Sequence, residues 1–333
     1  KRVILIRRTG QIEKQLALVG KESWWRKNVW YIQFGLLFIA LNVRLLLVNS
    51  DRTALGLFFI GVIATALAVG YFWGGKTWCN YICPVAIVQK IYTEPRGLLE
   101  SQAHISRQSI TQSMCRASTP EGDRSICVGC TPNCPDIDLE RSYWEGIEDP
   151  SLRHVYYAFF GLIVGFYCFF YFYSGGWDYY FSGTWTHEQD PIGDLLKPGI
   201  FINGMAIGIP KILSSPLILA VFVLAAVFLG KALEAFYRYL VKRMQMPLTE
   251  PEIINRCLSF SAYVSINTFY IFGGRSNLML LPSPVLRLVD ILIVALTTLW
   301  FWQAIQHNPM RYRREGLAAS LLEQLRKLKV DIS

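Results

Sequence analysis

The sequence predicts an all-α polytopic membrane protein with about six transmembrane helices and a polar, cysteine-bearing segment inserted between helices two and three. Hydrophobic residues make up 53% of the 333 residues, and charged residues make up only 17%. Soluble domains average roughly 45–50% apolar and about 25% charged residues. Apolar runs of about 20 residues, long enough to cross a bilayer, recur along the chain.

Hydropathy and charge divide the chain into five regions. These are residues 1–28, a basic cytoplasmic arm; 29–73, a transmembrane hairpin; 74–153, the cytoplasmic cysteine segment; 154–305, four further membrane segments with an acidic extracytoplasmic loop at 174–213; and 306–333, a basic amphipathic cytoplasmic tail. The polar turn at 49–52 separates two apolar runs, which predicts the hairpin. Residues 200–209 are expected to form a short interfacial or re-entrant piece.

The membrane segment at 258–272 is short for a transmembrane helix. Its apolar run is about 15 residues, whereas a full span needs roughly 17–25. A full crossing and an interfacial position are both open on this pattern. Only a full crossing keeps the basic tail on the same side as the N-terminal arm.

The charge distribution predicts which side of the membrane each region faces. The formal net charge is +9, and the basic residues gather in the arm, in the loop at 238–257 and in the tail. Lys and Arg concentrate on cytoplasmic segments of membrane proteins. The sequence therefore predicts a multi-pass protein of a bacterial-type inner membrane, with both termini and the cysteine segment cytoplasmic. The same pattern accounts for the positive charge without nucleic-acid binding.

Six of the 8 cysteines fall in the polar segment: Cys79, Cys83, Cys115, Cys127, Cys130 and Cys134. Cytoplasmic thiols stay reduced, which disfavours a disulfide framework and favours metal ligation. Zinc sites commonly pair two Cys-x2-Cys motifs or combine Cys with His. Here only Cys127 and Cys130 have that spacing, and His104 is the sole histidine within the segment.

Iron–sulfur ligation fits the spacing better than zinc. Bacterial ferredoxins end their ligand run with Cys-x3-Cys-Pro. That ending occurs twice, at Cys79–Pro84 and at Cys130–Pro135, the second overlapping a Cys-x2-Cys. Short spacings of this kind wrap the backbone around a cluster, and the proline turns the chain away from it. The pattern predicts at least one [4Fe-4S] cluster.

The run at residues 75–84, directly after an apolar helix, resembles the signature of the membrane-bound polyferredoxins. This family includes the NapH quinol dehydrogenase subunit, the NosR regulator and the CcoG copper reductase. Residues 127–139 resemble the family's ferredoxin motif, so the likeness covers about residues 70–140. The resemblance implies a ferredoxin-like segment with [4Fe-4S] clusters on the cytoplasmic face and electron transfer involving the membrane pool.

The chain departs from that family in its ligand count. Complete Cys-x2-Cys-x2-Cys-x3-Cys-Pro repeats are absent, and each cubane takes four thiolates, so six cysteines cannot ligate two clusters. One cluster is expected, and a second would need a non-cysteine ligand such as His104. Lys76 and Arg124 are candidates for the cluster environment, with ordinary topology-setting charge as the alternative. His154 is a candidate for a quinone pocket.

These observations favour a membrane-anchored electron-transfer protein. It would pass electrons between a quinone pool or redox partner and a client protein, for example as the electron-transfer subunit of an oxidoreductase. The expected partners are other subunits of a membrane redox complex. The alternative is an iron–sulfur redox-sensing, gas-sensing or maturation subunit without turnover of its own, which the incomplete ligand set would suit.

Overall fold

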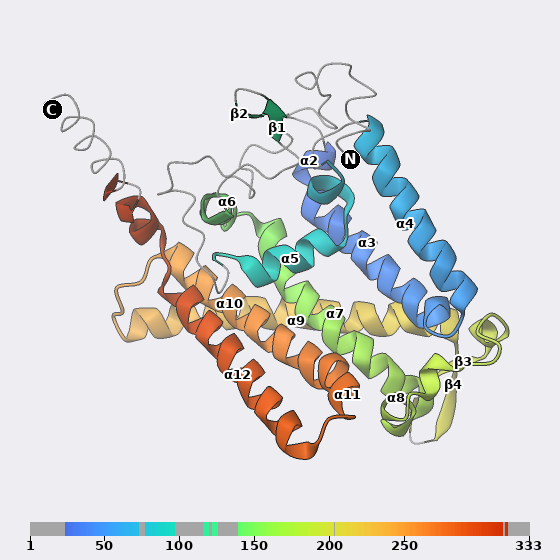
Figure 1. Cartoon of the computed structure of the whole chain (residues 1–333). Helices are drawn as coiled ribbons and strands as arrows, with labels where there is room; N and C mark the ends of the chain where they lie inside the picture. The colour runs from blue at the N-terminus through green and yellow to red at the C-terminus, as the bar shows by residue number, and fades with distance from the viewer. Residues whose placement is uncertain are drawn as a thin grey trace, which may run out of the picture.

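A bundle of long helices forms the body of the computed structural model, which describes residues 24–72, 77–96, 116–119, 122–125, 139–202, 204–315 and 317–318 (Figure 1). Among these residues, five helices are long and apolar enough to cross a membrane. They are Val29–Val48, Arg52–Phe72, Pro150–Ser174, Lys211–Arg243 and Ser283–Gln306. The chain is thus a multi-pass membrane protein in its composition and helix lengths. The remaining expected membrane segment, at 258–272, falls mostly within α10 (Glu250–Phe269), which has 20 residues but is less apolar than these five.

The first two long helices form the expected antiparallel hairpin. Helix α3 (Val29–Val43) follows the short α2 (Trp24–Lys27) and continues into a π-helical turn, η1 (Arg44–Val48). Helix α4 (Arg52–Phe72) then runs back (Figure 1). The Asp51 carboxylate accepts the backbone N–H of Thr53 at 2.7 Å, which satisfies a donor at the start of α4. Most of α4 is exposed and apolar, as expected for a lipid-facing helix.

Helix α7 (Pro150–Ser174) lies at the centre of the bundle, against α3, α9 (Lys211–Arg243) and α10 (Figure 1). Asp149 caps its N-terminus by accepting the Ser151 N–H at 2.8 Å. Glycines let α7 and α9 approach closely: a Cβ on Gly161 would lie 2.3 Å from a backbone oxygen of α9. On the α9 side, a Cβ on Gly230 would lie 2.2 Å from the Tyr157 ring. Small residues at such crossings are typical of membrane helix pairs.

One end of the bundle carries the first cysteine pair, and we call it the cysteine end. Its elements are η2 (Trp78–Ile82), α5 (Val85–Thr93) and α6 (Leu139–Gly146). η2 and α5 contact α3, α5 also contacts α10, and α6 lies beside the start of α10 and the residue that follows α12 (Ser283–Gln306). A helical turn at 309–315 follows α12. Within the cysteine segment, strands β1 (Arg116–Thr119) and β2 (Gly122–Ser125) pair as an antiparallel hairpin.

The opposite end differs from the expected loop. Short turns lead into a second antiparallel hairpin: α8 (Asp178–Phe181), η4 (Thr184–Thr186), η5 (Gly193–Leu196), β3 (Pro198–Ile202) and β4 (Met205–Pro210). Gly204, with φ of 76°, supplies the left-handed turn between the strands. The segment expected as a short interfacial or re-entrant piece, 200–209, belongs to a β-hairpin, and its position relative to the membrane stays a prediction. Two small hairpins also qualify the all-α expectation.

The connection into α12 completes the opposite end. Helix α10 continues through a π-helical turn, η6 (Tyr270–Gly274), into α11 (Arg275–Leu278). The Asp290 carboxylate of α12 accepts from the Tyr270 hydroxyl at 2.8 Å and pairs with Arg275 at 3.2 Å. These contacts hold α10 and α12 side by side as a second helical hairpin.

Candidate metal centre

The cysteine pair lies on a helical turn that ends for a simple steric reason. Cys79 is within η2, and Cys83 is the residue that ends it. A proline disfavours helical ψ in the residue before it. Cys83 accordingly has a ψ of 118°, while Pro84 (φ −66°), just before α5, already has the φ of a helical residue.

The same turn places both thiols on one face. Side chains four residues apart on a helical turn are neighbours, with Cβ atoms roughly 5–6 Å apart. The N–H of Cys83 donates to the Trp78 carbonyl at 2.8 Å, which closes the turn. Both cysteine residues are half-buried. The turn thus places the two predicted ligands four residues apart, and their binding to one metal site stays a prediction.

Apolar packing and one amide fix this turn against the membrane helices. Tyr81 within the turn is buried, and so are Ile87 and Ile91 on the next helix, α5. Gln33 of α3 donates its side-chain N–H to the Cys79 carbonyl at 2.9 Å. The Thr77 hydroxyl, just before the turn, is fully buried and makes no hydrogen bond within the described residues.

The other predicted ligands are not tested by the structure. Cys115, Cys127, Cys130, Cys134, His104 and Lys76 lie outside the described residues. Arg124 is part of strand β2, and the structure describes its backbone but not its side chain. Within the described residues, no group of three or more His, Cys, Asp or Glu side chains gathers as a metal site. The structure therefore describes Cys79 and Cys83 on one turn, and metal ligation by any of the predicted residues stays a prediction.

The donor set of this turn fits an iron–sulfur cluster. Within the described residues no His or carboxylate side chain joins its two cysteines in a metal-binding group, and thiolates are the ligands that such clusters take. Two thiols provide half of a cubane's usual four ligands. The rest of the set must come from elsewhere in the chain.

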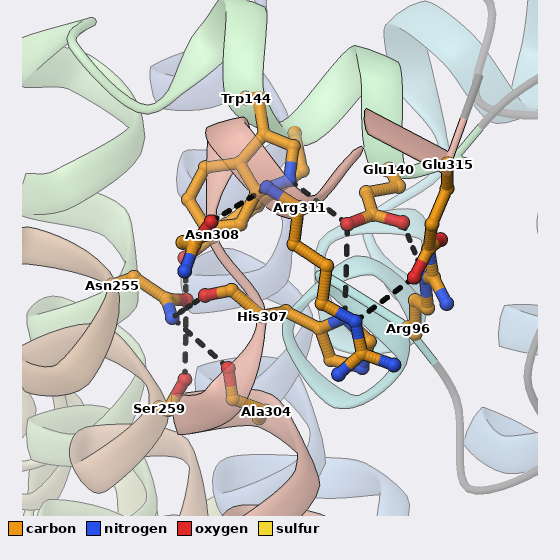
Figure 2. A network of polar contacts seen from close by, with 11 residues as sticks. Arg96, Glu140, Trp144, Asn255, Ser259, Ala304, His307, Asn308, Arg311 and Glu315 are labelled. Atoms are coloured by element: carbon orange, nitrogen blue, oxygen red, sulfur yellow. Dashed lines mark hydrogen bonds and ion pairs between the residues drawn. The ribbon is translucent and has the colours of Figure 1, made fainter. Parts of the chain in front are cut away.

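A charged cluster lies where the cysteine segment enters and leaves the bundle, and we call it the charged clasp: the buried Arg96 and Glu140 with the half-buried Glu315 (Figure 2). Arg96 forms an ion pair with Glu140, and its Nη2 lies 2.6 Å from Glu315. Arg96 and Glu140 are each 3% exposed in their side chains. The clasp thus joins the two ends of residues 97–139 to each other and to the turn that follows α12.

Neighbouring side chains complete the clasp (Figure 2). The Trp144 indole N–H donates to Glu140 at 3.0 Å, and His307 Nδ1 lies 3.8 Å from the same carboxylate oxygen. Arg311 donates to Glu315 at 2.9 Å. The Asn255 amide, which accepts the Tyr143 hydroxyl at 2.7 Å, fastens α6 to α10 beside it.

A second buried carboxyl, Glu94, lies at the end of α5. It pairs with Lys90 at 2.6 Å and accepts the Tyr156 hydroxyl at 2.8 Å. Burial raises the pKa of Glu94 above its ordinary value, although Lys90 and Tyr156 counteract part of this rise. The Lys90 ammonium also lies 4.4 Å from the centre of the Trp30 ring, so α5 is held to α3 as well as to α7.

His154, the predicted quinone contact, lies near the start of α7. Its Nδ1 is 2.8 Å from the Tyr31 hydroxyl of α3, and either atom can be the donor. Both residues lie at the same end of their helices as the cysteine turn. This pair places an imidazole and a phenol on the part of the bundle nearest the cysteines.

Sequence reasoning missed Gln33, Glu94, Arg96 and Glu140. Gln33 could have been found, because it is an amide near the start of an apolar run. The others look like ordinary charges at a membrane boundary. Their burial depends on helices that come from distant parts of the chain.

Comparison with known proteins adds one finding. The family model for a 4Fe-4S binding domain matches residues 55–100, which contain α4, the cysteine turn and α5. No curated protein matches the chain, and no solved structure does. The matched segment and the apolar helices define the class: this is a membrane-associated iron–sulfur protein that holds at least one [4Fe-4S] cluster. The cofactor prediction is confirmed to that extent.

Proposed function

We propose that this protein carries single electrons at the membrane surface through one or two [4Fe-4S] clusters. We also propose that it belongs to the membrane-bound polyferredoxins, the family that includes NapH and NosR. The observation that carries the proposal is the Cys79–Cys83 turn, fastened to the membrane helix α3 and lying inside the matched 4Fe-4S domain. A cluster embedded in this way keeps a fixed distance from the bilayer. Fixed placement suits electron exchange with a membrane-bound donor.

The chain's own residues hold the cofactor and set its surroundings. Cys79 and Cys83 supply two ligands, and further ligands come from Cys115, Cys127, Cys130 and Cys134. A bound [4Fe-4S] cluster supplies one-electron transfer. The charged clasp links Arg96 to Glu140. The chain that carries the second group of cysteines therefore leaves the bundle and returns to it at one place.

A quinone pool is the proposed membrane-side redox partner, and other subunits of a membrane redox complex are the proposed clients. Quinol oxidation releases two protons, so its site needs groups that accept hydrogen bonds and protons. The Tyr31–His154 pair offers such groups, because a phenol and an imidazole can both donate and accept hydrogen bonds. Both the cysteine turn and this pair are proposed to face the cytoplasm, as the distribution of Lys and Arg favours.

A second function, sensing without turnover, is favoured by the charged clasp. Glu315 follows the last long helix, yet it pairs with Arg96 at the entrance to the cysteine segment. A change in the cluster that moved the cysteine segment would therefore also move the helical turn at 309–315, which carries Glu315. A sensor would use that movement to signal to a partner.

A redox titration of the anaerobically purified full chain, combined with a quinol-analogue assay, tests the proposal. Electron transfer predicts a reversible cluster couple that a quinol analogue reduces in repeated cycles, with slower reduction in the His154→Ala variant. The matched control is His187→Ala, at the opposite end of the bundle. A cluster that decays upon oxidation and accepts no electrons from the analogue would favour the sensor instead.

A further inference from the structure

Gln33 is a buried amide inside the first membrane-spanning helix. Gln33 belongs to α3, and only 1% of the residue is exposed. A polar side chain in a membrane helix is costly unless it is hydrogen-bonded, so its partner indicates its role. That partner is the carbonyl of Cys79, at 2.9 Å, 46 positions along the chain.

The second buried amide of the same helix behaves differently. Asn42 donates to the Phe38 carbonyl within α3 at 2.8 Å and accepts the Ser215 hydroxyl of α9 at 2.7 Å. Its donor is used within its own helix, and its acceptor is used in packing against α9. Gln33 makes no such contact, and its Oε1 has no hydrogen-bond partner within the described residues. Its one described bond goes to a cysteine of the metal turn.

The carbonyl that Gln33 binds belongs to a predicted ligand residue. Cys79 lies in η2, and the amide reaches it across the gap between α3 and the turn. A carbonyl oxygen carries partial negative charge, which destabilises further negative charge on a nearby metal site. A donated N–H offsets this charge, and outer contacts of this kind tune metal centres and orient their ligands.

We propose that Gln33 is a positioning residue for the iron–sulfur site: it holds the Cys79 peptide against α3 and offsets the charge of its carbonyl. The inference rests on the proposed electron-carrying role of the cluster and adds a residue from a helix that bears no cysteine. Loss of the amide is expected to lower the reduction potential, because the reduced cluster is the more negative state. It should also loosen the turn and speed cluster loss.

The test compares Gln33→Met with Asn42→Leu in the full chain, purified anaerobically in detergent. Methionine keeps the length and flexibility of the side chain but removes the donor. Asn42→Leu removes the other buried amide of the same helix without touching the cysteine turn. We expect Gln33→Met to lower the midpoint potential and to speed iron release to a chelator about fivefold, the factor that corresponds to a lost hydrogen bond. Asn42→Leu should keep the wild-type potential.

A third variant, Gln33→Glu, keeps the test decisive if Gln33→Met does not fold. A buried carboxyl is neutral at low pH, where it can donate to the Cys79 carbonyl, and it loses that donor on ionisation. Its midpoint potential should match the wild type at low pH and fall more steeply as pH rises.

Three outcomes separate the ideas. Wild-type protein without a cluster would refute the proposed function itself. A wild-type cluster, with the potential and electron paramagnetic resonance (EPR) spectrum of Gln33→Met unchanged, would overturn the role of Gln33 alone. A Gln33→Glu potential that follows the wild type at every pH would overturn it equally.

Discussion

Replacing Arg96 with methionine should strongly destabilise the cysteine end, because it leaves Glu140 charged and buried. Both side chains are 3% exposed, so water screens them little. Removing one partner of a buried ion pair costs about 3–5 kcal/mol. The Trp144 N–H stays on Glu140 at 3.0 Å and compensates part of the loss. We therefore expect the free energy of unfolding to fall by about 3 kcal/mol, the lower end of that range.

The matched control is the Arg141–Glu145 pair on α6, the helix that carries Glu140. Its nitrogen–oxygen distance is 2.8 Å, but its side chains are 61% and 40% exposed. An exposed pair of this spacing is worth about 0.3–0.5 kcal/mol. Arg141→Met should thus change stability little. Chemical denaturation of the detergent-solubilised protein, followed by circular dichroism, measures both variants.

A double-mutant cycle separates the ion pair from other effects of the substitution. Adding Glu140→Gln to Arg96→Met removes the stranded charge, so the double variant should be less destabilised than the sum of the two single variants. Additive effects, or an Arg96→Met variant as stable as Arg141→Met, would refute the idea that the clasp stabilises this end.

Three further predictions concern the ligands, the helix packing and pH. Cys79→Ser should lower the iron and sulfide content of the purified protein, whereas Cys168→Ser on α7 should leave both unchanged; equal losses would argue against ligation by the turn. Gly161→Ala should destabilise the bundle by about 1–3 kcal/mol, an overpacking cost, because its Cβ would meet the α9 backbone at 2.3 Å. Gly56→Ala, with nothing within 4 Å, should be neutral in the same denaturation assay. Burial raises the pKa of Glu94 above 4.5, so the folded state binds its proton more tightly than the unfolded state does. The stability that this proton contributes should be fully present below pH 4.5 and should decline as pH rises through the folded pKa. Glu94→Gln should flatten that decline in melting curves measured across pH, and an unchanged slope would contradict it.

Hydropathy and spacing were sufficient to predict the helical membrane class and the iron–sulfur chemistry. Long apolar runs carry their own signal, and Cys79–Pro84 contains both the ligands and the residue that ends the turn. These features are local, so a sequence displays them directly. The resemblance to particular polyferredoxins goes further than the matched domain and stays a prediction.

The features that sequence missed depend on contacts between distant segments. Arg96 and Glu315 are 219 positions apart, and Gln33 and Cys79 are 46 apart. No periodicity links such pairs, because helix packing alone brings them together. The hairpin at 198–210 was missed for a different reason. Its apolar residues do not reveal strand pairing by themselves, and the fold-back depends on the turn at Gly204.

The measurement that tests the central claim most directly is quantitation of iron and acid-labile sulfide in the full chain purified without oxygen, with EPR on the reduced protein. The account predicts about four irons and four sulfides or more per chain, and a reduced-cluster signal. Protein that contains zinc and no iron or sulfide would contradict it.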